Sequence, residues 1–232
     1  MQYIMKNMLY IAATMLLCSS CFHVNTNWNG GKNAVKGEGP VVTKSFDLKD
    51  FDAICVNGNA DVVFTQADAW EVTVRTQENV IDELDYRVEG GKLIIEAKDH
   101  RTIRAEVYDL TVKAPDLKEI EVNGAADFKI PAGLRTEGNM KVEVNGAGDL
   151  SFKGIACGDL KIETNGASDI EALDINSKSL VIRINGAGDV DVTGKTGDAT
   201  LEVNGAGDIN ASGLKATGEV KKRSSGLAKI TL

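Results

Sequence analysis

One carboxylate recurs at the same place in an octapeptide that the chain repeats five times. The copies are EVNGAADF from Glu121, EVNGAGDL from Glu143, ETNGASDI from Glu163, RINGAGDV from Arg183 and EVNGAGDI from Glu202. The repeated acids are Asp127, Asp149, Asp169, Asp189 and Asp208, and the repeated amides are Asn123, Asn145, Asn165, Asn185 and Asn204. Such a row could bind a cation, supply catalytic acids, or form one turn of a stacking fold.

The cation hypothesis has partial chemical support. Calcium takes carboxylate and carbonyl oxygens as ligands, but calcium-binding solenoids of the nonapeptide type have denser Gly-Asp repeats than this chain. Only two His are present, which argues against a zinc site built from His. We therefore expect no metal and no cofactor, with calcium at the Asp row as the alternative.

The catalytic hypothesis has few candidates outside the repeat. Asp99, His100, Arg101 and Arg104 form a charged cluster in AKDHRTIRAEVYD. A polysaccharide-cleaving enzyme needs acids that converge in one groove. The cluster is more typical of a solvated loop than of such a site, so we expect no catalytic residues.

The spacing of the repeat favours a structural role. The Asn positions are separated by 22, 20, 20 and 19 residues, and Ser225 follows 21 residues later in a degenerate copy. An early copy at Asn57 lies 66 residues before Asn123, or three steps of 22. A fixed period of this length is the signature of a solenoid, which we expect from residue 41 to residue 232.

The pattern within each period predicts strands. Apolar and polar residues alternate on both sides of the turn, as in Val142, Glu143 and Val144, which indicates half-buried strands. A helical turn is expected only at residues 78–85. We therefore predict an all-β parallel solenoid with about 20 residues per coil, and roughly nine coils spanning about 45 Å at the strand spacing.

This architecture explains the repeated residues. Gly supplies backbone angles that other residues avoid, and an Asp carboxylate can accept backbone N–H groups in a turn. Asn residues at equivalent places in successive coils can form an amide ladder. We therefore interpret the Asn and Asp rows as a structural turn ladder.

The N-terminal segment is typical of an export signal. Lys6 precedes an apolar run that is too short to span a bilayer, and small residues then lead to Cys21. We predict a lipoprotein signal peptide at residues 1–20, lipidation of Cys21, and a flexible tether at residues 21–40 before the domain at 41–232. Plain secretion and an uncleaved anchor are the alternatives, and the start codon could be Met1 or Met5.

Charge and cysteine usage narrow the partners. The net charge of −8 argues against a nucleic-acid partner, because phosphate binding requires a basic face. Removal of Cys18 and lipidation of Cys21 would leave Cys55 and Cys157. Since these lie four to five coils apart in the expected register, on the order of 20 Å, both should be free thiols.

The chain resembles a known family. The segment FDAICVNGNADVVFTQ (Phe51 to Gln66), the segment WEVTVRTQENVIDELDYRVEGGKLIIEA and the serial NGAGD turns are similar to the head GIN domain family of auto-transporter adhesins. The resemblance covers about residues 41–232. It implies a right-handed, single-stranded parallel β-helix related in shape to pectin lyases, a secreted or lipid-anchored envelope protein of Gram-negative bacteria, and a role in adhesion. It implies no catalytic residues.

These observations favour a non-enzymatic cell-envelope lipoprotein, an adhesin or surface-interaction scaffold. Its expected partners are the membrane, through the lipid anchor, and a cell-surface glycan or protein. The alternative is a polysaccharide-binding or polysaccharide-cleaving β-helix. We expect an outer-membrane location, and the absence of an acidic cluster after Cys21 leans toward the periplasmic face.

Overall fold

The structure of this protein is a computed structural model that describes residues 34–232. These residues form one compact unit that is almost entirely β. Its elements, in chain order, are β1 (Ala34–Lys36), β2 (Val41–Phe46), β3 (Ala53–Gly58), β4 (Asp61–Gln66), β5 (Glu71–Gln77), α2 (Glu78–Ile81), β6 (Leu84–Glu89), β7 (Lys92–Ala97), the 3₁₀ turn η1 (Lys98–His100), β8 (Thr102–Arg104), β9 (Tyr108–Ala114), β10 (Glu119–Gly124), β11 (Asp127–Ile130), β12 (Leu134–Arg135), β13 (Met140–Lys153), β14 (Ile155–Ala156), β15 (Asp159–Gly186), β16 (Val190–Gly205), β17 (Asp208–Ala216), β18 (Val220–Gly226) and β19 (Lys229–Thr231).

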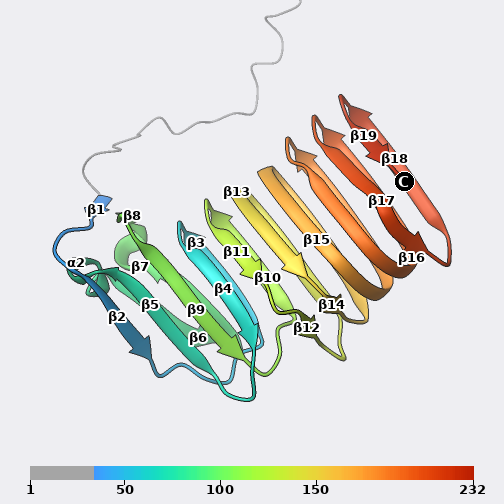
Figure 1. Cartoon of the computed structure of the whole chain (residues 1–232). Helices are drawn as coiled ribbons and strands as arrows, with labels where there is room; N and C mark the ends of the chain where they lie inside the picture. Colours follow the sequence, from blue (N-terminus) through green and yellow to red (C-terminus); the bar gives the residue numbers. More distant parts are fainter. Residues whose placement is uncertain (1–33) are drawn as a thin grey trace, which may run out of the picture. The chain divides into compact units, whose positions relative to one another are not determined.

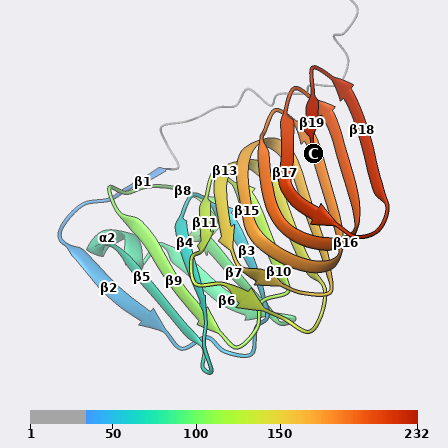
Figure 2. The same cartoon turned by 45° about the vertical axis from the view of Figure 1, so that its right-hand side comes forward.

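The expected solenoid of parallel coils is confirmed. From β10 onward each coil lies on the previous one in parallel register, as in Ile120↔Val142 and Val142↔Ile162 (Figure 1). Equivalent residues are 19 to 22 positions apart in the sequence. Each coil has a strand before the Asn-Gly turn, a strand after it, and a short third strand such as β12 or β14. Figure 2 shows the same coils from a second side.

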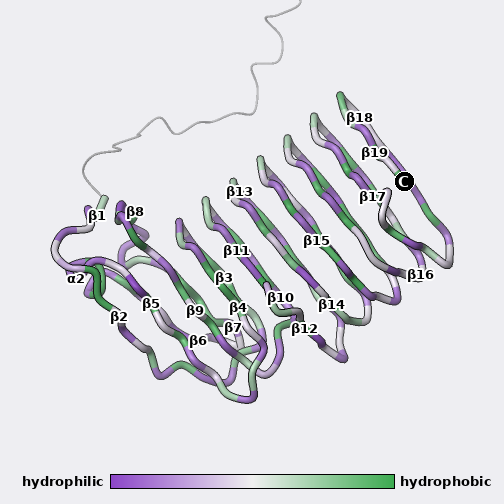
Figure 3. The backbone as a smooth tube through the Cα atoms, viewed as in Figure 1, coloured by the Kyte–Doolittle hydropathy of each residue, from purple (hydrophilic) through white to green (hydrophobic). Residues whose placement is uncertain are grey.

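The core consists of columns of apolar side chains that continue from coil to coil. One column after the turn contains Phe128, Leu150, Ile170, Val190 and Ile209, each at most 1% exposed. Hydrophobic and hydrophilic residues alternate along the strands, so every strand contributes one face to this interior (Figure 3). Because a single coil cannot cover its own apolar face, each coil is stabilised by its neighbours.

The Asn-Gly turn requires glycine for two reasons. Gly146 has φ of +150°, a region that residues with a side chain rarely adopt. In addition, a Cβ on Gly146 would lie 2.0 Å from the carbonyl oxygen of Gly124 in the coil beneath. The turns therefore stack backbone on backbone, with no room for a side chain between them.

The predicted number of coils is wrong. Asn57 is not three coils from Asn123 but directly adjacent to it, since β3 pairs with β10 and β4 pairs with β11. The solenoid has about five turns rather than nine.

The 60 or so residues between these strands extend the two sheets instead of adding coils. On one sheet β3 is followed by β7 and then by antiparallel β6; on the other, β4 is followed by β9 and then by antiparallel β5 and β2. The strand period of two is the same in both arrangements, because alternation reports a buried face and not the direction of the neighbouring strand.

The start of the folded unit and the helix also differ from the expected limits. Residues 34–40, assigned above to the tether, belong to the described unit: β1 pairs in parallel with β8, and Glu78 N donates to Pro40 O at 2.9 Å. The helix α2 stops at Ile81, before the expected residue 85, because the chain enters β6 at Leu84. Within residues 34–232, no helix has the length and apolar character needed to cross a bilayer.

Cys55 and Cys157 are both free thiols, as expected. The expected separation of four to five coils between Cys55 and Cys157 is wrong, because their coils are two steps apart. What separates the thiols is also their side of the solenoid: Cys55 lies on β3, before the turn, and Cys157 follows β14 on the third side.

Candidate binding surface

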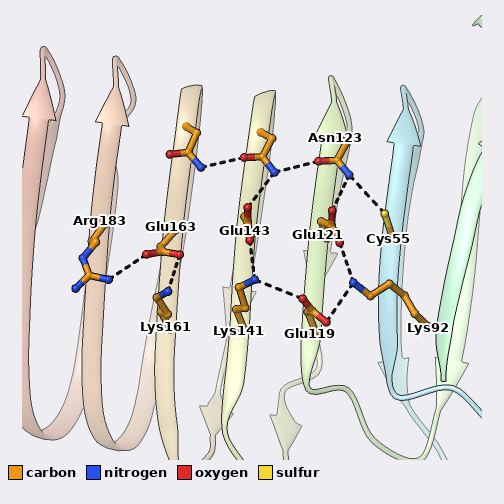
Figure 4. Close-up of polar contacts among 12 residues, drawn as sticks. Cys55, Lys92, Glu119, Glu121, Asn123, Lys141, Glu143, Lys161, Glu163 and Arg183 are labelled. Atoms are coloured by element: carbon orange, nitrogen blue, oxygen red, sulfur yellow. Dashed lines mark hydrogen bonds and ion pairs between the residues drawn. The ribbon is translucent and has the colours of Figure 1, made fainter. Parts of the chain in front are cut away.

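The repeated Asn residues form a continuous file of side-chain hydrogen bonds on one sheet (Figure 4). Each amide Nδ2 donates to the Oδ1 of the preceding coil at 2.9 to 3.1 Å, in the order Asn123 to Asn57, Asn145 to Asn123, Asn165 to Asn145, Asn185 to Asn165 and Asn204 to Asn185. Ser225 closes the file by donating its hydroxyl to Asn204 at 3.0 Å. Asn residues inside the file thus donate through Nδ2 to the coil before and accept through Oδ1 from the coil after.

Glu96 terminates the other end of the file, and sequence reasoning missed it. Its side chain is 7% exposed, accepts a hydrogen bond from Asn57 Nδ2 at 3.0 Å, and pairs with Arg87 at 2.5 Å. Burial works against ionisation of Glu96, but the hydrogen bonds from Arg87 and Asn57 outweigh it and lower its pKa. No sequence signal identifies this residue, because the pairing of β7 with β3 lies outside the repeat.

A row of charged residues lies beside the Asn file, two residues earlier in each coil. It contains Glu121, Glu143, Glu163, Arg183, Glu202 and Arg223, with Cys55 at the same position of the first coil. We call the outward side chains of this row and of the Asn file the ladder face. Adjacent carboxylates on neighbouring strands repel one another, so the row requires cations close by.

Basic residues supply this neutralisation (Figure 4). Lys92 Nζ lies 2.8 Å from Glu121, Lys141 lies 2.6 Å from Glu143, and Lys161 lies 2.7 Å from Glu163. Arg183 bridges two coils, with contacts of 3.1 Å to Glu163 and 2.8 Å to Glu202. The ladder face is therefore a lattice of opposite charges at fixed positions.

These contacts hold the carboxylates in their ionised form. Hydrogen bonds from Lys92 and Asn123 lower the pKa of Glu121. Hydrogen bonds from Lys141 and Asn145 do the same to the pKa of Glu143. For Glu163, burial raises the pKa, but the hydrogen bonds from Lys161 and Arg183 outweigh it and the net shift is downward.

The general acid of a glycoside hydrolase needs the opposite shift in pKa. A general acid in glycoside hydrolysis has a raised pKa, so that it carries a proton at neutral pH. The carboxylates of the ladder face can bind hydrogen-bond donors and cations, but they cannot deliver protons efficiently.

The Asp row lies on the other side of the turn, and four of its carboxylates accept backbone N–H groups from the next coil. Asp149 N donates to Asp127 Oδ1 at 3.2 Å, Asp189 N to Asp169 at 3.3 Å, and Asp208 N to Asp189 at 2.9 Å. Lys229 N completes the series by donating to Asp208 at 2.8 Å. Among residues 34–232, no three His, Cys, Asp or Glu side chains are placed to hold a metal ion.

Two further acids extend this row toward the N-terminal strands. Asp61 is the register partner of both Asp127 and Asp109. Burial, followed by the charges of Asp127 and Asp109, raises the pKa of Asp61. Asp61 thus differs from the carboxylates of the ladder face in the direction of its shift.

The charged cluster at residues 99–104 is only partly brought together. His100 and Arg101 line an open hollow of about 650 Å³, together with Asn57, Asn59 and Asn123, whereas Asp99 and Arg104 are not among its lining residues. His100 is 84% exposed on its side chain and lies 3.5 Å from Glu96, and Arg101 pairs with Glu83. The hollow therefore opens at the head of the Asn file, next to the ladder face.

The family model described as "Putative auto-transporter adhesin, head GIN domain" matches residues 50–232. The chain belongs to the head GIN domain family. Among curated proteins, none is significantly similar to it.

Solved structures share the fold of this head GIN domain. A "putative adhesin" from Parabacteroides distasonis has a TM-score of 0.77 and 21% identity, over 85% of this chain and 84% of its own. A "putative lipid binding protein" from the same species has a TM-score of 0.72 and 23% identity, over 86% of this chain and 100% of its own. A "putative adhesin" from Bacteroides fragilis has a TM-score of 0.68 and 16% identity, over 85% and 99%. At these identities the similarity establishes the fold alone.

The residues expected to connect the domain to a membrane cannot be placed. Cys21, the signal segment 1–20 and residues 21–33 of the tether lie outside the described residues. Lipidation and the outer-membrane location therefore stay predictions from the sequence.

Proposed function

We propose that this chain is a non-enzymatic lipoprotein of the cell envelope, anchored to the outer membrane through lipidated Cys21. Its head GIN domain presents the ladder face to a glycan or protein on a cell surface. The observation that carries the proposal is the lattice of paired charges beside the Asn file, which is fixed in position and ionised.

The chemistry of the ladder face suits a polar, extended partner. Carboxylates accept hydrogen bonds, Lys and Arg donate them, and both kinds of group recur along the stack at about the 4.8 Å strand spacing. A glycan offers hydroxyl groups that can donate and accept, so several coils can contact one chain at once. Because the backbone of each coil is already ordered, little conformational entropy is lost on binding.

A binding assay with matched variants tests this proposal. The full chain is applied to arrays of bacterial and host glycans, and the Lys141→Glu/Lys161→Glu variant is compared with it. These changes disrupt the charge lattice, and we expect at least a tenfold loss of binding. Lys178→Glu/Lys195→Glu, exposed residues on the third side, makes the same change in net charge and should bind normally. Equal binding by all three proteins would contradict a role for the ladder face.

The alternative function, polysaccharide cleavage, is favoured by one observation. Asp61 has a raised pKa next to the carboxylate of Asp127, and acid pairs on adjacent positions are used by retaining glycosidases. A reducing-end assay on the polysaccharides that bind decides between the two functions. We expect no release of reducing ends; release that is lost in Asp61→Asn would replace the binding proposal by an enzymatic one.

The anchor and the lipid-binding name of one structural relative require separate measurements. Cell fractionation should place the full chain in the membrane fraction and Cys21→Ala in the soluble fraction. Protease shaving of intact cells then distinguishes the surface from the periplasmic face. Binding of the Cys21→Ala chain to lipid vesicles would indicate that the domain itself contacts lipid.

A further inference from the structure

The sheet that carries the ladder face ends in two strands that each pair on one side only. Among the described residues, β18 pairs with β16 and β6 pairs with β7. Each therefore has a row of backbone N–H and C=O groups outside the ladder. Such edges are templates for pairing with another chain unless charge or cover blocks them.

The two ends carry opposite charge. Residues 210–232, which include β18, contain five basic residues and the single acid Glu219, a net charge of +4. Residues 78–90, which include α2 and β6, contain five acids and the single base Arg87, a net charge of −4. The remainder of the domain is acidic, since residues 34–209 contain 19 basic and 33 acidic residues. The C-terminal end is therefore basic in contrast to the rest of the domain.

These charges select which edges can meet. Two copies of β18 would bring Lys221, Lys222 and Arg223 against the same residues, which costs free energy at close range. Two copies of β6 would bring Asp85 and Glu89 together in the same way. The combination of β18 with β6 instead places the three bases of β18 opposite Asp85 and Glu89, whose charges are only partly offset by their shared ion-pair partner Arg87.

The last coil also exposes apolar surface at this end. Leu227 is 88% exposed and Val220 is 37% exposed. The apolar column before the turn stops here, because Lys222 and Ser224 occupy the positions of the buried Leu201 and Val203. A contact at this end would remove Leu227 and Val220 from solvent. The core itself is not exposed at this end.

We propose that two copies of this chain associate head to tail, with β18 of one copy placed against β6 of the next. The directions of the strands permit this contact. Since β7 runs parallel to the coil strands and β6 runs antiparallel to β7, copies stacked in one orientation pair β18 and β6 as antiparallel strands. The contact uses different surfaces on the two copies, so it does not close and continues into a filament.

Sedimentation of the full chain in density-matched detergent tests the proposal, which is independent of the function proposed above. At about 20 mM salt the average mass should rise with concentration, and at about 500 mM salt it should fall toward the monomer as the charges are screened. Lys221→Glu/Arg223→Glu blocks the basic end, and Asp85→Lys/Glu89→Lys blocks the acidic end. Each variant alone should associate at least tenfold more weakly than the unmodified chain.

Mixing the two variants gives the decisive result. In Lys221→Glu/Arg223→Glu both edge strands present acids, and in Asp85→Lys/Glu89→Lys both present bases, so unlike charges meet only between the two variants. The equimolar mixture should therefore assemble again, with the two variants alternating. Lys178→Glu/Lys195→Glu, which makes the same change in net charge as Lys221→Glu/Arg223→Glu but away from the ends, should assemble like the unmodified chain.

Three results would overturn the proposal. They are a monomer at every salt and concentration, a mixture of folded variants that stays monomeric, or assembly that survives in both end variants. Circular dichroism verifies folding, and Lys221→Gln/Arg223→Gln replaces the reversed variant if that one unfolds.

Discussion

Asn123 donates its side-chain amide to Asn57 across 66 residues of sequence, with 3.0 Å between Nδ2 and Oδ1. This bond joins the first repeat to the second, although six strands, β4 to β9, lie between the two residues in the chain. The Asn file therefore does not depend on the length or structure of the chain between its members. Only the register of neighbouring strands has to be maintained.

Removal of one amide from the file should weaken the domain measurably. Asn165→Ala deletes the donor to Asn145 and the acceptor of Asn185, so we expect a loss of about 1 kcal/mol in the free energy of unfolding. Denaturant titration measures it. Asn176→Ala, at an exposed Asn on the third side, should change stability by less than about 0.5 kcal/mol. Equal effects of the two changes would contradict a stabilising file.

A pair of glycine variants separates close approach from backbone strain. Gly58 and Gly146 occupy the same turn position with φ of +131° and +150°, but a Cβ on Gly58 meets nothing within 4 Å. Gly58→Ala should therefore cost about 1 kcal/mol from strain, whereas Gly146→Ala should cost about 3 kcal/mol or more because the coils must separate. Thermal unfolding compares them, and similar losses would show that stacking at the turn is not tight.

The ladder face should make the domain sensitive to acid. The folded-state pKa of Glu163 is lowered, so its contribution to stability is present above the unfolded pKa of about 4.3 and is lost as pH falls through the folded value. Melting temperature should therefore drop as pH decreases from about 5. Glu163→Gln should be less stable than the unmodified chain at pH 7, and the difference should shrink in acid.

Glu137→Gln serves as the control for that measurement. Glu137 is an exposed acid in the loop before β13, so its replacement should leave the pH profile unchanged. A difference between Glu163→Gln and the unmodified chain that persists in acid would mean that the charge of Glu163 is not its source.

The two thiols of the domain should react slowly in the folded state. Burial raises the pKa of Cys55 and of Cys157 to about 11, so at pH 8 only about one thiol in a thousand is ionised. Cys157 is more exposed than Cys55 and should react first. Thiol titration in denaturant should count both residues in the described domain, and a count of zero would contradict their free state.

Chelation should leave the domain unchanged. Four of the five carboxylates of the Asp row accept backbone N–H groups of the next coil, as between Asp208 N and Asp189. A calcium ion present at 100 times its Kd would contribute about 2.7 kcal/mol, or roughly 5 to 10 °C in melting temperature for a domain of this size. We expect no shift on addition of chelator, and a drop of that size would support the cation alternative.

The repeated half of the molecule could be predicted from the sequence because the same motif marks equivalent positions in neighbouring coils. The spacing of Asn145, Asn165 and Asn185 determines both the coil length and the register. The unrepeated half could not be predicted in this way. The interval from Asn57 to Asn123 is divisible by 22, but two of its strands, β5 and β6, pair antiparallel with their neighbours. Alternation in EVTVRTQ is equally compatible with either direction.

The candidate surface was likewise predictable only where its residues repeat. Asn and Asp were identifiable by repetition, whereas the cations that neutralise the Glu row vary in position between coils. Lys92 comes from β7 and Arg183 from within the row, so no common spacing reveals them. Glu96 was missed for the same reason.

The turn built from Gly146 and its counterparts makes the coils interchangeable modules. Since Asn145 and Asn165 occupy equivalent places, excision of residues 146–165 would join two identical backbone geometries and leave a shorter, intact protein. Duplication of the same segment would lengthen it. The reach of the ladder face is therefore an adjustable property that deletion or duplication of one genetic unit can change without a new fold.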